Sequence, residues 1–414
     1  MYRNIVEATR LTRAGQVANA TALLLRTLRG RTTTVDIHNG PAANPSTENA
    51  SRSTDFAVPR VEAQGLQSAP RIAPSFGRHT DEPAARGPTP GALNSFLKRV
   101  VPLRPDMLQS GLVRPSPLKR ISVPDGARFI ESVYSDDIGQ RAYKLYIPSS
   151  YQGQARPLIV MLHGCTQTPD DFAAGTRMNE LAEEHNFLVV YPAQSISANS
   201  SKCWNWFNPR DQRREQGEPA LIAGITRRVM RDYAVDETRV YVAGLSAGGA
   251  AAAIMSKAYP DLYAAVGVHS GLACGAANDL PSAFAAMQGG NNFSAWATRA
   301  TNTRIVPTIV FHGDQDATVS PCNGDQVIAQ SRGATSSTKW TSVENAQVPR
   351  GHAYSRMLYT DPDGRSILEQ WVIRGAGHAW SGGSLAGSYT DPQGPDASRE
   401  MVRFFLQHDF PEAG

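Results

Sequence analysis

The sequence predicts an α/β fold in which a mostly parallel sheet is covered by helices on both faces. From Ala127 onward, short apolar runs alternate with segments of helical periodicity, which indicates strands connected by helices. Several of these runs are continuously apolar, as is typical of strands buried on both faces. One run, ending at Ala243, leads through a glycine-rich turn directly into a helix of small residues.

The individual elements can be placed along the chain. Residues 129–134 and 143–147 are predicted to form an antiparallel pair at the start of the folded domain. Apolar, β-branched runs predict the remaining strands at 157–162, 187–191, 238–243, 264–268, 305–311 and 367–373. Helical periodicity predicts helices at about 170–184, 219–232, 247–257, 281–288, 324–331 and 397–407. No internal repeat is visible.

The strand at 238–243 ends in the pattern Gly-x-Ser-x-Gly, formed by Gly244, Ser246 and Gly248. Between a strand and a helix, this pattern is typical of a sharp turn that strains the serine backbone and exposes its hydroxyl. The flanking glycines allow the strand and the helix to approach closely. Ser246 is therefore predicted to be the nucleophile of a serine hydrolase. The alternative is an ordinary glycine-rich turn.

A serine nucleophile needs a base, and the base needs an acid that orients it. His378 lies in a glycine-rich loop just after a strand, where an imidazole can reach the serine. Asp314 and Asp316 follow an earlier strand, and Asp316 is preferred because it lies four residues after His312 in His-Gly-x-x-Asp. The chain order of serine, aspartate and histidine is that of the α/β-hydrolase fold.

The tetrahedral intermediate of such a reaction needs two backbone N–H donors directed at its oxyanion. One donor is expected from Ala247, the residue after the nucleophile. The other is expected from Cys165 or Thr166, in the loop that follows the strand at 157–162. This loop precedes Ser246 in the chain, as the α/β-hydrolase order requires.

Six motifs occur together between about Ile121 and Phe410. They are His-Gly-Cys-Thr-Gln from 163, Cys-Trp-Asn-Trp-Phe from 203, Gly-Leu-Ser-Ala-Gly-Gly from 244, His-Ser-Gly-Leu from 269, His-Gly-Asp-Gln-Asp from 312 and Gly-His-Ala-Trp-Ser-Gly-Gly from 377. Together they resemble the poly(3-hydroxybutyrate) depolymerase family of esterases, which includes feruloyl and acetylxylan esterases. The resemblance implies a secreted-type domain whose nucleophile, acid and base are Ser246, Asp316 and His378. This chain differs in having no recognisable C-terminal polymer-binding domain, and a long N-terminal extension in place of an obvious signal peptide.

The resemblance implies hydrolysis of short-chain polyester or oligoester bonds, of the 3-hydroxybutyrate type, through an acyl-enzyme on Ser246. The alternatives are a feruloyl or acetylxylan-type carbohydrate esterase and, in another class, a non-catalytic binding protein on a hydrolase scaffold. Trp204, Trp206 and Trp380 are predicted to line the substrate subsite, with core packing as the alternative. No Cys and His spacing indicates a zinc site and no phosphate loop is present, so neither a metal nor a cofactor is expected.

The four cysteines of the chain all follow predicted strands at the edge of the sheet where the site is expected. Of the three pairings that four cysteines allow, Cys165–Cys203 with Cys274–Cys322 is preferred. Such pairing indicates an oxidising compartment, which agrees with the extracellular location that the resemblance implies. The alternative is four reduced thiols in a cytoplasmic protein, since no export signal is recognisable.

The first 120 residues differ in composition from the rest of the chain. They hold 12 of the 28 prolines, and their 17 Lys and Arg against 8 Asp and Glu give a net charge of +9; the remainder carries −5. Residues 31–120 lack apolar periodicity and are predicted to be a disordered linker before a catalytic domain at 121–414. Basic residues scattered without aromatic neighbours do not indicate nucleic-acid binding.

Residues 1–30 are predicted to be a separate helical segment. Apolar residues recur with helical spacing between 4 and 28, but arginines interrupt any apolar core, so the segment does not fit a signal peptide or a membrane span. One interpretation is a helix that packs on the catalytic domain or a partner. The other is an amphipathic anchor to a lipid or polyester-granule surface. The sequence leaves the oligomeric state open.

Overall fold

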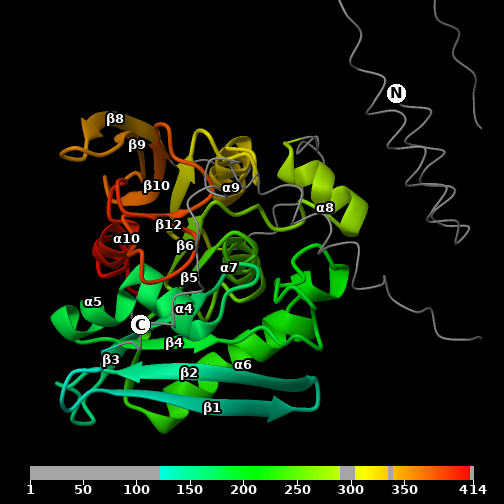
Figure 1. Cartoon of the computed structure of the whole chain (residues 1–414), viewed down its shortest axis with the longest axis vertical. Coiled ribbons are helices and arrows are strands. Elements are labelled where there is room, and N and C mark those ends of the chain that lie inside the picture. Colours follow the sequence, from blue (N-terminus) through cyan, green and yellow to red (C-terminus); the bar gives the residue numbers. More distant parts are fainter. Residues whose placement is uncertain (1–121, 290–303, 334–338, 411–414) are drawn as a thin grey trace, which may run out of the picture. The chain divides into compact units, whose positions relative to one another are not determined.

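The computed structural model describes residues 122–289, 304–333 and 339–410, which form a ten-stranded sheet (Figure 1). The strand order is β1-β2-β4-β3-β5-β6-β7-β10-β9-β8. The six central strands are parallel: β4 (Leu188–Pro192), β3 (Arg156–Leu162), β5 (Val235–Leu245), β6 (Ala265–His269), β7 (Thr308–Gly313) and β10 (Ser366–Ile373). Antiparallel strands extend both edges: β1 (Arg128–Asp136) with β2 (Gly139–Ile147), and β9 (Ala353–Thr360) with β8 (Lys339–Gln347).

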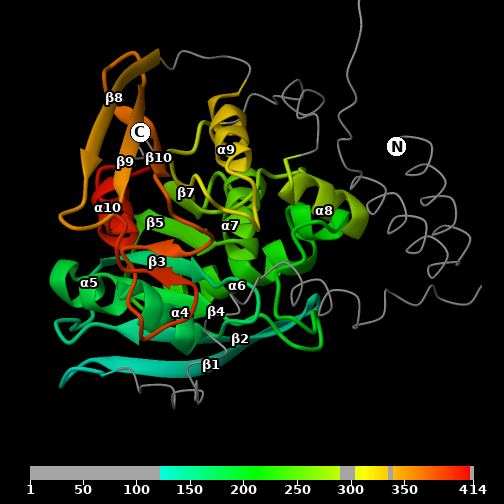
Figure 2. The ribbon, with the colours of Figure 1, turned by 45° about the horizontal axis from the view of Figure 1, so that its top comes forward.

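Helices cover the sheet on both faces, as the sequence predicts. One apolar core lies between the sheet and α6 (Gly217–Asp232), α7 (Ala247–Ala258) and α9 (Cys322–Arg332). A second core lies between the opposite face and α4 (Pro169–Thr176), α5 (Met178–His185) and α10 (Ala397–Phe405). Figure 2 shows these layers, with α8 (Leu280–Met287) beside α7. The short strands β11 (Trp380–Ser381) and β12 (Thr390–Asp391) pair separately, and η2 (Pro209–Gln212) is a 3-10 helix.

The predicted α/β-hydrolase fold is confirmed by this arrangement. Two features differ from the sequence prediction. The single helix expected at 170–184 is two helices, because the backbone of Arg177 is left-handed, with φ 54°, and interrupts the helix. The Arg177 side chain donates hydrogen bonds to Asp396 and to the Gly382 carbonyl. The strands β8 and β9 were not expected, and β8 is exposed along nearly its whole length. An element solvated on both faces has no apolar alternation to reveal it.

Several sequence predictions concern residues that the structure does not describe. The helix at 4–28 and the linker at 31–120 lie outside the described residues. Contact of the N-terminal segment with a lipid or polyester-granule surface therefore stays a prediction. Within the described part of the chain, no helix is long and apolar enough to cross a membrane.

The turn between β5 and α7 is the tightest approach of backbone segments near the sheet edge. A Cβ atom on Gly248 would lie 2.0 Å from the carbonyl oxygen of Leu162, at the end of β3. A Cβ on Gly244 would lie 2.3 Å from the backbone of Gly248. Real Cβ atoms do not approach backbone atoms so closely, so both positions require glycine if β3, β5 and α7 are to pack as they do.

Replacing Gly248 with alanine should therefore separate α7 from β3 and destabilise the fold by about 3 kcal/mol, the upper range for overpacking a tight contact. Urea unfolding followed by circular dichroism measures this. Gly377→Ala is the matched control, because a Cβ at Gly377 meets nothing within 4 Å. Equal unfolding midpoints for the two variants would contradict the steric argument.

Candidate active site

Ser246 occupies the turn between β5 and α7 in a backbone conformation that L-residues rarely adopt. Its φ is 57° and its ψ is −118°, and it directly precedes the first residue of α7. Its backbone N–H donates to the His269 carbonyl at 2.9 Å, so β6 helps to hold the turn. The residue is partly exposed, whereas its neighbours Leu245 and Ala247 are buried. This is the strained strand-to-helix turn that the Gly-x-Ser-x-Gly pattern predicts.

His378 and Asp316 form a hydrogen-bonded pair. The Nδ1 atom of His378 lies 2.7 Å from Oδ2 of Asp316. The other carboxylate oxygen of Asp316 accepts backbone N–H groups from Thr318 at 2.9 Å and Val319 at 2.8 Å. The imidazole therefore faces a carboxylate that is already fixed by its own loop, which is how an orienting acid is held.

Asp314 has a different role. Its Oδ1 accepts the Gly375 N–H at 2.7 Å, and its Oδ2 lies 3.6 Å from the guanidinium of Arg374. These contacts join the loop after β7 to the loop after β10 without reaching His378. The structure thus brings His378 together with Asp316 and leaves Asp314 as a loop residue.

The three candidate residues come from three parallel strands that end at the same sheet edge. Ser246 follows β5, Asp316 follows β7 and His378 follows β10. The loops after β7 and β10 are in close contact, since the Gln315 N–H donates to the Ala376 carbonyl at 3.0 Å. Carboxyl ends of parallel strands are the usual place for sites in open α/β sheets. Ser246 and His378 share no hydrogen bond in the described residues, and such bonds often tighten only when substrate binds.

His269, at the end of β6, connects both sides of this site. Its carbonyl holds Ser246, and its Nε2 accepts the Ser381 N–H at 3.0 Å. Its ring stacks on Phe311 and Trp380, with centroids 5.8 and 5.0 Å away. Burial lowers the pKa of His269 to about 3, so the ring is neutral near pH 7. The neutral ring of His269 therefore places no positive charge beside His378.

The charge state of Asp316 is also set by its surroundings. Burial alone would raise its pKa, but hydrogen bonds from His312 and His378 outweigh burial and hold the pKa of Asp316 well below its usual range. The carboxylate is thus ionised at any pH where the domain would work. An ionised carboxylate can accept a hydrogen bond from an Nδ1–H group, which is the arrangement that a base at Nε2 of His378 would need.

Cys165 and Ala247, which are predicted to supply the two oxyanion donors, line the same pocket as Ser246. Ala247 is the first residue of α7, and its N–H belongs to the helix N-terminus, whose backbone donors attract negative charge. On the other side, the Thr166 N–H donates to the Ser201 carbonyl at 2.7 Å. Because that donor is already used, Cys165 is favoured over Thr166 as the second oxyanion residue.

The predicted disulfide between Cys165 and Cys203 is present, with a Cα–Cα distance of 4.2 Å. It joins the loop after β3, the predicted oxyanion loop, to the loop that contains Trp204 and Trp206, the tryptophan loop. The prediction of a Cys274–Cys322 bond is wrong, because both thiols are free. Cys274 bonds through its backbone to the side chain of Gln330, eight residues beyond Cys322 on α9. Eight residues of helix span about 12 Å, beyond the reach of a disulfide.

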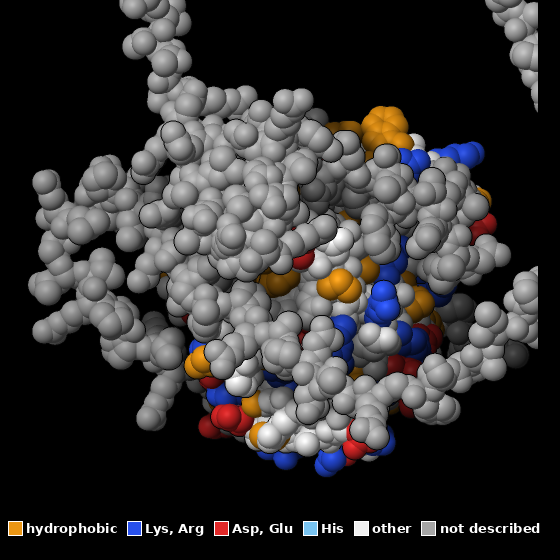
Figure 3. Space-filling view, turned by 90° about the vertical axis from the view of Figure 1, so that its right-hand side faces the viewer, with side chains coloured by type: hydrophobic (Ala, Val, Ile, Leu, Met, Phe, Trp, Pro, Cys, Tyr) orange, Lys and Arg blue, Asp and Glu red, His pale blue; other side chains and the backbone are white. Residues whose placement is uncertain are grey.

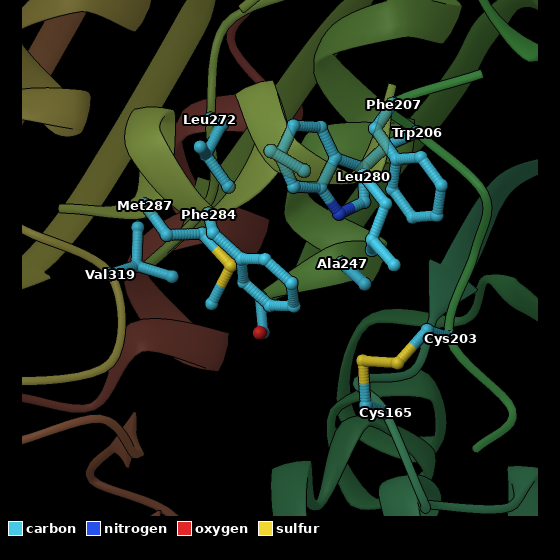
Figure 4. Close-up of a pocket in the computed structure, with 12 residues that line it drawn as sticks. Cys165, Cys203, Trp206, Phe207, Ala247, Leu272, Leu280, Phe284, Met287 and Val319 are labelled. Carbon is cyan, nitrogen blue, oxygen red and sulfur yellow. A yellow bond between two sulfur atoms is a disulfide. The ribbon is translucent and has the colours of Figure 1, made fainter. Parts of the chain in front are cut away.

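An apolar pocket opens beside Ser246 (Figure 4). Trp206 and Phe207 lie on one side, and Leu272, Phe284 and Met287 lie on the other, with the disulfide near Ala247. The complete lining is Cys165, Cys203, Trp206, Phe207, Ser246, Ala247, Leu272, Leu280, Ala283, Phe284, Met287 and Val319. The side of the molecule where α8 lies in Figure 1 shows hydrophobic side chains at its surface beside Lys and Arg (Figure 3).

The three predicted subsite tryptophans separate in the structure. Trp206 lines the pocket. Trp204 is completely buried, and its Nε1–H donates to the His163 carbonyl at 3.0 Å. Trp380 is also buried, and its Nε1–H donates to the Ser398 hydroxyl at 3.0 Å. Trp204 and Trp380 therefore pack in the core, which corrects their expected place at the subsite.

The sequence prediction missed the residues of α8 that form a pocket wall. Leu280, Ala283, Phe284 and Met287 occur at helical spacing, and this pattern also fits a helix packed on the core. Asp279 begins the helix with a capping box, which fixes where α8 starts. No group of three His, Cys, Asp or Glu side chains within the described ranges is placed to hold a metal ion.

Comparison with known proteins agrees with the motifs. Residues 141–345 match the family described as esterase PHB depolymerase. The matched residues include Ser246 and Asp316, so the match agrees with the resemblance that the motifs indicate. The chain is 32% identical over 241 residues to poly(3-hydroxyalkanoate) depolymerase C of Paucimonas lemoignei. This alignment covers 56% of this chain and 57% of that protein. This chain thus spans little more than half the length of that relative.

Two other similar proteins are named as a feruloyl esterase and an acetyl xylan esterase. Feruloyl esterase B of Neurospora crassa is 27% identical over 241 residues, covering 53% of this chain and 77% of that protein. The acetyl xylan esterase of Aspergillus awamori superposes with a TM-score of 0.54 at 20% identity, covering 68% of this chain and 99% of the other. That superposition supports the fold. The homologues are carboxylic ester hydrolases.

The two aspartates give a direct test of the His378–Asp316 pair. Asp316→Asn should lower kcat by about 10⁴-fold, because an amide presents the wrong partner to Nδ1 and favours the wrong tautomer. Asp314→Asn is the matched control and should stay within about tenfold of wild type, since Asp314 bonds only loop groups. Kinetics on a soluble p-nitrophenyl ester provide the measurement. The reverse order of effects would assign the orienting role to Asp314.

Reduction of the Cys165–Cys203 disulfide should lower kcat/KM by at least about tenfold before the domain unfolds, because the bond ties a predicted oxyanion donor to the tryptophan loop. Activity and circular dichroism are followed together during titration with a thiol reductant. A Cys274→Ser, Cys322→Ser double variant is the control that removes effects of the free thiols. Full activity in the reduced, folded protein would show that the bond does not shape the site.

Proposed function

We propose that this chain is a serine esterase that hydrolyses short-chain polyester or oligoester bonds, of the 3-hydroxybutyrate type, through an acyl-enzyme on Ser246. The observation that carries the proposal is the apolar pocket that opens at Ser246, at the sheet edge where the His378–Asp316 pair is held. The match of residues 141–345 to an esterase family supports the reaction class.

Each candidate residue has a step in the proposed reaction. The Ser246 hydroxyl attacks the ester carbonyl while Nε2 of His378 takes its proton, and Asp316 stabilises the imidazolium that forms. The N–H groups of Cys165 and Ala247 bind the oxyanion. His378 then protonates the leaving alcohol, which departs as the C–O bond breaks. Water, deprotonated by His378, attacks the acyl-enzyme, and Ser246 leaves with the proton, releasing the acid.

The chemistry of the pocket favours an aliphatic ester. Apart from Ser246, its described lining consists of apolar side chains and the disulfide. Apolar walls stabilise a bound alkyl chain by burying its surface, at about 0.8 kcal/mol for each CH₂ group. A ferulate phenol or a sugar hydroxyl buried against such walls would lose its hydrogen bonds to water without gaining new ones.

A second candidate is a feruloyl or acetylxylan-type esterase, which the names of two relatives favour. A sugar or phenol could remain outside the apolar pocket while the ester reaches Ser246. A third reading, a non-catalytic binder on a hydrolase scaffold, would leave the strained Ser246 turn and the buried acid–base pair without a purpose. Such strain persists only where the surrounding structure enforces it.

The disulfide bears on where the domain works. Disulfides persist in oxidising compartments and are rare in the cytosol. We therefore propose that the catalytic domain acts outside the cytoplasm.

A panel of esters tests the proposed function. Wild type should hydrolyse 3-hydroxybutyrate oligomers with a kcat/KM at least about tenfold above that for methyl ferulate or acetylated xylan, a difference expected from one or two well-buried methylene groups. Ser246→Ala is the control and should reduce turnover of every ester by several orders of magnitude while the fold persists. A preference for ferulate would select the second candidate. Turnover by folded Ser246→Ala would contradict the mechanism.

A further inference from the structure

A buried carboxylate lies behind one wall of the pocket, and no catalytic motif accounts for it. Glu218 is in the first turn of α6 and only 7% exposed. Buried carboxylates are rare unless paired, because burial disfavours their charge. The hydrogen bonds that the Glu218 side chain accepts come from Asn205 and Gln194, and they lead toward the loop that contains Cys203, Trp206 and Phe207.

The side chain of Glu218 holds this loop at two points. Its Oε2 accepts the Asn205 backbone N–H at 2.7 Å, and its Oε1 accepts the Asn205 side-chain amide at 2.7 Å. Oε1 also accepts the Gln194 side-chain amide. That amide in turn donates to the Cys203 carbonyl at 2.8 Å. Glu218 therefore fixes Asn205 directly and Cys203 through Gln194.

The same network reaches the loop after β3. The Gln194 backbone N–H donates to Nε2 of His163 at 3.0 Å. His163 is completely buried, and its carbonyl accepts the Trp204 indole N–H at 3.0 Å. Cys165, two residues after His163, is bonded to Cys203. Glu218 thus lies at the centre of the contacts that join the tryptophan loop to the predicted oxyanion loop.

The loop that Glu218 holds forms one wall of the pocket. Cys203, Trp206 and Phe207 all line the pocket, whereas Asn205 between them faces the carboxylate. Displacement of Asn205 would move Trp206 and Phe207, the next two residues of the chain. The effect would fall mainly on the binding of an acyl chain that fills the pocket, and less on an acetyl group that hardly enters it.

Every hydrogen-bond partner of the Glu218 side chain is a donor, so the network needs the ionised carboxylate. A protonated carboxyl would direct its O–H at a donor and lose at least one of these bonds. The charged groups that face it are Arg141, 4.0 Å away, and Asp211, which accepts the Glu218 backbone N–H at 2.8 Å. Burial and then Asp211 raise the pKa of Glu218 to about 7, while His163, whose pKa burial lowers to about 4, stays neutral in that range.

We propose that Glu218 is a positioning residue whose carboxylate holds the Trp206–Phe207 wall and thereby sets the preference of the site for longer acyl chains. This inference rests on the proposed esterase function. Above the titration of Glu218 the wall is held and the longer chain is preferred. Below it one bond of the network is lost and the preference declines.

The test is the ratio of kcat/KM for p-nitrophenyl butyrate to that for p-nitrophenyl acetate, measured from pH 5.5 to 8.5 at the p-nitrophenol isosbestic wavelength. Because both esters react at the same site, any effect of pH that is common to both cancels in the ratio. The wild-type ratio should fall about tenfold as the pH is lowered, the effect expected from loss of one hydrogen bond to a charged group. Glu218→Gln should show the low ratio at every pH, with kcat for acetate within about threefold of wild type.

Glu183→Gln is the matched control, because Glu183 accepts hydrogen bonds from Tyr146 and Ser149, away from the pocket. It should keep the wild-type ratio and its pH dependence. Asn205→Ala removes one bond to Glu218 and should lower the ratio about threefold even if Glu218→Gln does not fold. A pH-independent wild-type ratio, or an unchanged ratio in Asn205→Ala, would overturn the inference while leaving the esterase intact. Failure of wild type to hydrolyse either ester would overturn both proposals.

Discussion

The contact between Gly248 and the Leu162 carbonyl determines where the other parts of the site can lie. It presses the first turn of α7 against the end of β3, with room for no Cβ atom between them. Ser246 and Ala247 are thereby brought beside the loop that begins at His163. The left-handed backbone of Ser246 follows from the same constraint, since the chain must reverse sharply between β5 and α7. The proposed nucleophile and the two proposed oxyanion donors can meet only because three backbone segments pack this closely.

Neutral, buried histidines hold the loops around this contact. His163 accepts a bond from Gln194, and His269 accepts one from Ser381. Burial lowers the pKa of both, so that each ring keeps an unprotonated nitrogen for its bond. The unfolded chain would protonate these rings below about pH 6.5, whereas the folded chain does not. Their contribution to stability is therefore fully present above that pH and is lost as the pH falls toward 4.

The sequence predicts the central strands, the Ser246 turn and the Cys165–Cys203 bond, because each depends on local pattern or on loops that end at one sheet edge. It could not show that Trp204 and Trp380 are buried in the core and do not line the pocket. A tryptophan in the pocket wall and one in the core beneath it can have the same neighbours in sequence. The predicted Cys274–Cys322 bond is wrong although both residues follow expected strands. Cys322 begins α9, whereas Cys274 lies beside Gln330, near the other end of that helix. The sequence also could not predict the proposed role of Glu218. That role depends on hydrogen bonds from Asn205 and Gln194, which are 13 and 24 residues away in the chain.

We propose that the packing around Gly248 makes Ser246 an activated nucleophile. A fluorophosphonate probe, followed by peptide mass spectrometry, measures this without any choice of natural substrate. We expect one covalent adduct, on Ser246, formed with the native protein, slowed by a competing butyrate ester and absent after unfolding. A native, folded protein that gives no adduct, or an adduct on another serine, would contradict it.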